Sequence, residues 1–203
     1  MTGRRKVSNK LIFKIFAINI FVVIVFSILE KSLLNICLEA GQNELASMGM
    51  VELFFLAVLL APPLEEFIFR FPLVRRGIWP IALLFGIVFV NISVPNNALL
   101  MSAILTGSLF ILIEYLFEKQ QQVNILTAVL YVFIFTFIHI GNYQEEVFKD
   151  KTFVHICLLF FPQFCLGSIL TWLRLKKVNF SKIILYHSAY NLIFFILILL
   201  SKL

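Results

Sequence analysis

The sequence predicts an all-α protein, a polytopic transmembrane helical bundle of about seven spans, and three observations support this fold class. The 203 residues are 61% hydrophobic and 14% charged, whereas a soluble domain is nearer half apolar and about a quarter charged. The apolar residues form runs long enough to cross a bilayer. Lysines and arginines lie mostly between these runs, and every predicted inner loop is basic.

The predicted spans follow one another with short polar connections, without a soluble domain and without an obvious internal repeat. The first apolar run, 11–29, follows the basic segment Arg4-Arg5-Lys6. It is too long for a signal peptide, and no small-residue cleavage site follows it. The later spans are predicted at about 47–71, 79–94, 98–117, 123–143, 152–173 and 180–200. We therefore expect residues 1–203 to form a single transmembrane domain.

The distribution of positive charge predicts the orientation of the bundle. With the N-terminus in the cytoplasm, thirteen lysines and arginines fall on the inner side and four on the outer side, Lys31, Lys149, Lys151 and Lys202. The formal net charge of +6 is thus explained by topology, and we expect no nucleic-acid partner. The compact chain and the lack of retention signals favour the plasma (inner) membrane of a prokaryote.

Two adjacent carboxylates, Glu65 and Glu66, interrupt the apolar second span. Ionisable residues at membrane depth are costly and by default indicate function. Arg70 follows Glu66 at the spacing of a helical ion pair, which leaves Glu65 free to face a cavity. Pro62-Pro63 is predicted to begin a new helix whose positive N-terminal end favours ionised carboxylates. Burial favours the neutral form, and the sequence does not decide between the two effects.

Two histidines lie in the later spans, His139 in the fifth and His187 in the seventh. Asn191 follows His187 by four residues, so both project from one helix face and could donate two hydrogen bonds to one oxygen, as an oxyanion hole requires. Glu65 and His139, from two other helices, could hold and deprotonate a water. For either histidine alone, a helix-packing hydrogen bond is the more ordinary role.

Depth in the membrane is the difficulty with this grouping. Counted from the span centres at about 1.5 Å per residue, His139 lies outward of Glu65 and His187 by roughly 10 Å. Helix tilt, the proline break, or errors of a few residues at the span ends would close this offset.

Three motifs, in this order, resemble the signatures of the CAAX protease and bacteriocin-processing (CPBP) family: Glu65-Glu66-x-x-x-Arg70, Phe135-x-x-x-His139 and His187-x-x-x-Asn191. The resemblance covers roughly residues 61–191. It implies a protease core at about 47–200, with a helical hairpin at about 79–117 inserted between the first two motifs. That family includes the Ras-converting CAAX endopeptidase and many bacterial intramembrane proteases.

The resemblance also implies roles for the residues that match the motifs. Glu65 and His139 would activate a water, and His187 with Asn191 would stabilise the tetrahedral oxyanion. Glu66 and Arg70 would be the supporting pair.

A metal-free mechanism is implied as well, although two histidines and a glutamate are acceptable zinc ligands and zinc remains the alternative. The sequence has no HExxH motif. The three cysteines, Cys37, Cys157 and Cys165, lack CxxC spacing and are interpreted as apolar membrane residues.

We therefore expect an intramembrane endopeptidase that hydrolyses a peptide bond of a membrane-associated peptide or of a small membrane protein's terminus, with the lipid bilayer as its surroundings. The sequence indicates neither a particular substrate nor an oligomeric state. One alternative is a non-catalytic maturation or immunity factor that uses the same polar site for binding. Another is a transporter with a proton relay, which the lack of paired repeats disfavours.

Overall fold

The computed structural model describes residues 7–34, 49–74, 108–109, 111–112, 125–139 and 153–201. Within this part of the chain the regular structure is entirely helical, which confirms the predicted all-α class.

Five predicted spans, the first, second, fifth, sixth and seventh, correspond to helical segments of the structure. These segments are α1 (Asn9–Leu34), the continuous series α3 (Met50–Phe54), η1 (Phe55–Leu60) and α4 (Ala61–Phe69), α7 (Ile125–Ile138), α8 (Phe153–Leu175) and α9 (Phe180–Ser201). The third predicted span lies outside the described residues. Of the fourth, residues 108–109 and 111–112 are described, and all four are helical. The count of seven spans and the cytoplasmic N-terminus stay predictions.

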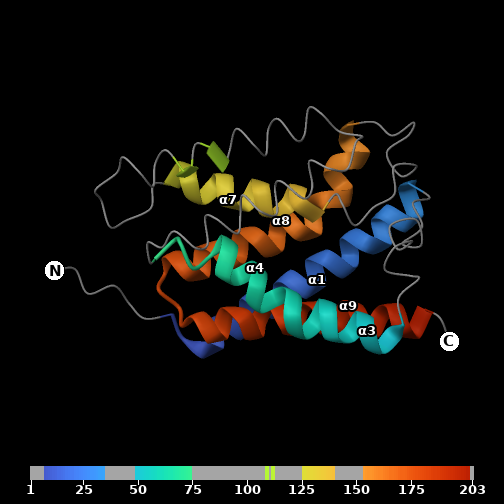
Figure 1. The fold of residues 1–203 in the computed structure, drawn as a ribbon. Coiled ribbons are helices and arrows are strands. Elements are labelled where there is room, and N and C mark those ends of the chain that lie inside the picture. Colours follow the sequence, from blue (N-terminus) through green and yellow to red (C-terminus); the bar gives the residue numbers. More distant parts are fainter. Residues whose placement is uncertain are drawn as a thin grey trace.

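Helix α8 holds the described bundle together, because it packs against α7, α9 and α1. Figure 1 shows the series α3–η1 running beside α9 at one edge, α7 and α8 at the other, and α4 between them. Contacts of α4 with both α7 and α9 bring the elements that carry the three motifs to one place. Phe69, Phe135, Leu170 and Ile183, from four different helices, are fully buried in the core around that place.

The second predicted span is one unbroken series of helical turns that changes geometry in the middle. Its central segment η1 is a π-helix, and the N–H of Ala61 at its end donates to the carbonyl of Leu56, five residues back. Pro62 and Pro63 then occupy the first positions of α4, where a missing N–H is tolerated. The proline pair lies in the first turn of α4 as predicted, but the expected break does not occur, because the π segment runs directly into α4 with helical backbone at Leu60 and Ala61.

The turn between α8 and α9 is a helix-ending motif followed at once by a helix cap. Lys177 has a left-handed backbone (φ 60°), and the N–H of Val178 donates to the carbonyl of Leu173 over 3.1 Å, as in a Schellman motif. Asn179 then caps α9, since its Oδ1 accepts from the N–H of Ser181 over 3.0 Å. This tight turn fixes the position from which α9 enters the bundle.

One helix in the described part of the chain, Phe180–Leu197, is long and apolar enough to cross a membrane, and Ile125–Ile138 is a shorter apolar helix. Only 22% of the longer stretch is buried inside the protein, unlike the core helix of a soluble protein. Large apolar side chains also point outward from several helices. They include Phe13, Phe21, Val51, Ile125 and Leu185. This outer surface suits a lipid environment.

Candidate active site

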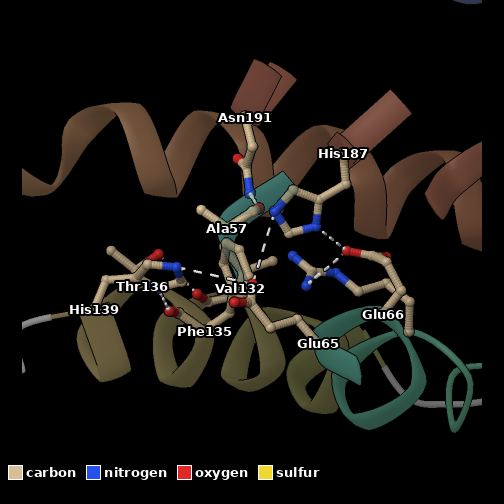
Figure 2. A network of polar contacts seen from close by, with 10 residues as sticks. Ala57, Glu65, Glu66, Val132, Phe135, Thr136, His139, His187 and Asn191 are labelled. Atoms are coloured by element: carbon tan, nitrogen blue, oxygen red, sulfur yellow. Dashed lines mark hydrogen bonds and ion pairs between the residues drawn. The ribbon is translucent and has the colours of Figure 1, made fainter. Parts of the chain in front are cut away.

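The carboxylate of Glu65 lies between the two predicted histidines. Its Oε2 is 3.8 Å from Nε2 of His139 and 3.7 Å from Nε2 of His187 (Figure 2). The offset of roughly 10 Å between His139 and the other two residues, which is expected for untilted spans, is therefore absent. Glu65 is 23% exposed and His139 16% exposed, whereas His187 is buried. The point where the three groups meet thus retains limited access from outside the core.

The orientation of His139 is set by its own helix. Its Nδ1 lies 2.7 Å from the backbone carbonyl oxygen of Phe135, one turn earlier. A carbonyl can only accept a hydrogen bond, so Nδ1 carries the proton and donates it. In the neutral imidazole the lone pair is then on Nε2, which is the nitrogen that faces Glu65. The first and last residues of the Phe135-x-x-x-His139 motif are therefore joined directly.

The second carboxylate, Glu66, has two partners in the core. Its Oε1 lies 3.3 Å from Nη1 of Arg70, so the predicted i,i+4 ion pair is confirmed. The same oxygen lies 2.8 Å from Nδ1 of His187, a contact that the spacing of the motifs did not predict. Glu66 and Arg70 are both fully buried. Glu66 thus connects the buried arginine to one of the two imidazoles beside Glu65.

The ring of Phe135 supports both the arginine and the histidines. The guanidinium carbon of Arg70 lies 3.9 Å from the ring centroid, a close cation–π contact. The imidazole rings of His139 and His187 pack against the same ring in T-shaped arrangements, at centroid distances of 4.7 and 6.0 Å. On α8, Gly167 leaves room for this arrangement, because a Cβ there would lie 2.8 Å from the Phe135 ring. Sequence reasoning missed these roles of Phe135 and Gly167.

Asn191 is held by a backbone group of the π-helix. Its Nδ2 donates to the carbonyl oxygen of Ala57 over 2.8 Å, and Figure 2 shows the amide reaching toward Ala57 beside the imidazole of His187. The carbonyl cannot donate, so the nitrogen and not the oxygen of the amide must face it. One of the two amide hydrogens is used in this bond, and the other is left for a second acceptor.

The charges in this cluster do not cancel when every carboxylate is ionised. Glu65 and Glu66 contribute two negative charges and Arg70 one positive charge, so a single negative charge remains. A proton on one imidazole would neutralise it. Of the two imidazoles, His187 lies nearer to a carboxylate oxygen, because its Nδ1 is 2.8 Å from Oε1 of Glu66. The cluster therefore places two carboxylates, two imidazoles and one guanidinium in direct succession, which are groups that can accept and donate protons.

Side chains that could ligate a metal do converge here, since Glu65, His139 and His187 are chemically suitable donors. However, the described part of the chain contains no group of three or more His, Cys, Asp or Glu side chains arranged to hold a metal ion.

In a comparison with known protein families, one family model matches this chain. The model for "Type II CAAX prenyl endopeptidase Rce1-like" matches residues 47–193, which include all six residues predicted for the site. No curated protein and no solved structure matches the chain.

Proposed function

This chain belongs to the Rce1-like type II CAAX prenyl endopeptidase family, and from that membership we propose that it is an intramembrane endopeptidase. It hydrolyses a peptide bond of a membrane-associated peptide or of a small membrane protein's terminus. The family consists of membrane-bound proteases, so peptidase activity and a membrane location apply to the chain at that general level. The observation that carries the specific proposal is the carboxylate of Glu65 facing the Nε2 atoms of two histidines at 3.7 and 3.8 Å.

The proposed nucleophile is a water between Glu65 and His139. Atoms 3.8 Å apart are too far for a direct hydrogen bond, but both can bond one water at about 2.8 Å each. The Nε2 lone pair of His139 accepts one hydrogen of this water and orients it. Oε2 of Glu65 then removes the other proton as the water oxygen bonds to the carbonyl carbon of the substrate.

The oxyanion formed in this step accepts hydrogen bonds from His187 and Asn191. Because Nδ1–H of His187 is directed at Glu66, a neutral ring would present only a lone pair at Nε2. His187 therefore acts as an imidazolium, with the Glu66 carboxylate balancing its charge. The second N–H of Asn191 completes the pair of donors. Collapse of the oxyanion re-forms the carbonyl and breaks the C–N bond, and the leaving nitrogen takes the proton held by Glu65.

No metal is required for these steps, because each proton and each developing charge has a protein group assigned to it. We further propose that the protein is a multi-pass protein of a prokaryotic plasma membrane, with the N-terminus in the cytoplasm. The thirteen-to-four distribution of basic residues supports this orientation.

The test compares the wild type with Glu65→Gln, each purified and reconstituted in liposomes. A farnesylated peptide ending in a CAAX sequence and its unprenylated counterpart serve as probes, with products identified by mass spectrometry. A second arm compares peptides released from cell membranes that contain either protein. We expect cleavage only by the wild type. Equal peptide sets from both proteins would favour the alternative, a non-catalytic maturation or immunity factor that binds through the same site.

A further inference from the structure

The proline pair before the first motif leaves a backbone carbonyl without its helical partner. In an α-helix the carbonyl of Ala57 would accept from the N–H of Ala61, but that N–H donates to Leu56 instead. In a continuing π-helix Ala57 would accept from residue 62, and Pro62 has no N–H. Both possible ladder donors are therefore lost at this one carbonyl.

The acceptor left in this way is the one that Asn191 uses. Its Nδ2 donates to the Ala57 carbonyl over 2.8 Å, across 134 positions of sequence (Figure 2). The bond is partly buried, and a carbonyl shielded from water is costly to leave without a donor, so the amide of Asn191 satisfies a need that the proline creates. In return the carbonyl determines which way the amide faces, because only its nitrogen can bond there.

We propose that Pro62 is a positioning residue for Asn191: by withholding a backbone N–H, it keeps the Ala57 carbonyl available to orient the amide that donates to the oxyanion. This inference deepens the proposed function and rests on it for the catalytic consequence. The orientation of the amide itself does not depend on that function. The π segment has a role in this view, since an α-helical ladder through Ala57 would occupy the same carbonyl.

Pro62→Ala tests the proposal because it restores a donor. The new N–H can bond Ala57 in π geometry. Alternatively it can bond Val58 in α geometry, in which case the N–H of Ala61 moves to Ala57. Either way the carbonyl of Ala57 gains a backbone partner that competes with Asn191. The matched control is Pro63→Ala, whose new N–H can reach Val58 or Leu59 but not Ala57.

The kinetic readout is a double-mutant cycle with Asn191→Ala in the reconstituted protein, measuring kcat and KM. We expect Pro62→Ala to lower kcat by about tenfold or more, with a smaller change in KM. The double variant Pro62→Ala/Asn191→Ala should then be no slower than Asn191→Ala alone. The effects of Pro63→Ala and Asn191→Ala on kcat should instead multiply when the two changes are combined. Multiplying effects of Pro62→Ala and Asn191→Ala would overturn the proposal, because a packing defect acts independently of Asn191.

A second readout does not require turnover. In protein labelled with ¹⁵N at asparagine, the spectrum of Asn191→Ala identifies the side-chain amide signal of Asn191. We expect one of its hydrogens to exchange slowly with solvent in the wild type and in Pro63→Ala, and quickly in Pro62→Ala. Unchanged protection in Pro62→Ala would refute the positioning role even if the protein cleaves no peptide. If the wild type cleaves no peptide but Pro62→Ala still loses the slow exchange of the Asn191 amide, only the proposed protease function would be refuted.

Discussion

At the scale of single residues, His187 connects two halves of the site. Its Nδ1 lies 2.8 Å from Glu66 and its Nε2 lies 3.7 Å from Glu65, so each nitrogen faces a different carboxylate. The pairing of Glu66 with Arg70 was predictable from the spacing within one helix. The contact of Glu66 with His187 joins residues 121 positions apart, and no local pattern encodes such a pair.

Glu66→Gln should damage both stability and catalysis. The substitution leaves the fully buried Arg70 without its anion, and breaking a buried pair typically costs roughly 3–5 kcal/mol. A neutral amide also cannot balance an imidazolium at His187. Both the unfolding temperature measured in detergent and the kcat of the reconstituted protein should fall. Glu65→Gln is the matched control, expected to abolish turnover while leaving the unfolding temperature near that of the wild type.

A wild-type unfolding temperature in Glu66→Gln would contradict the role of Glu66 as the partner of Arg70. Wild-type activity in Glu65→Gln would contradict the role of Glu65 as the base. Both variants replace a glutamate with a glutamine, at adjacent positions. A difference between them is therefore due to the position of the carboxylate and not to the type of substitution.

Asn191→Ala should lower kcat, measured by steady-state kinetics, by about 10²–10³, which is the usual cost of losing one oxyanion donor.

Activity of the wild type should survive thorough chelation, because no step of the proposed mechanism uses a metal. The checks are steady-state kinetics and elemental analysis of active purified protein. Stoichiometric zinc that is lost together with activity on chelation, and restores activity when added back, would establish the zinc mechanism instead.

At the scale of elements, α8 positions a site to which it contributes no motif residue. Gly167 lets the Phe135 ring approach closely, and a Cβ there would also lie 3.4 Å from Nη2 of Arg70. One end of the same helix reaches α4, since Nε of Arg174 donates to the backbone carbonyl of Arg70 over 3.2 Å. Nη1 of Arg174 also donates to the carbonyl of Val178 over 3.3 Å, which links α4 to the turn before α9.

Gly167→Ala is therefore expected to destabilise the protein by overpacking. The added methyl would meet the Phe135 ring at 2.8 Å, closer than packed atoms tolerate, and the ring is confined by Arg70 and His139. Overpacking of this kind typically costs about 1–3 kcal/mol. We expect a lower unfolding temperature together with reduced activity, since Phe135 also holds His139 through its carbonyl.

The matched control is Gly49→Ala at the start of α3. A Cβ at Gly49 meets nothing within 4 Å, and the backbone there is extended (φ −60°, ψ 143°), which alanine accepts. Its cost should stay below about 1 kcal/mol, the difference in capping between glycine and alanine. Equal destabilisation by the two variants would show that the space at Gly167 is not what matters.

At the scale of the whole molecule, the helical class and the order of the helices were predictable because hydropathy is encoded locally. The first, second, fifth, sixth and seventh predicted spans correspond to helices within a few residues. The π segment and the carbonyl at Ala57 were not predicted, because they depend on how the proline pair is accommodated between two helical stretches. The meeting of Glu65 and His139 was expected from the motifs but not from span depths, since tilt cannot be read from one sequence.

Topology is the last prediction, and it concerns the arrangement of the whole chain in the membrane. The N-terminus and the basic loop 174–179 are expected in the cytoplasm, and the loop 144–151 outside, because positively charged loops are retained on the inner side. Single cysteines placed in each segment of a cysteine-free variant, labelled in sealed cells with a membrane-impermeant reagent, measure this directly. Only the cysteine in 144–151 should react from outside. Labelling of the cysteine in 174–179 from outside would show that α9 has the opposite orientation. The substrate would then reach His187 from the opposite side of the membrane.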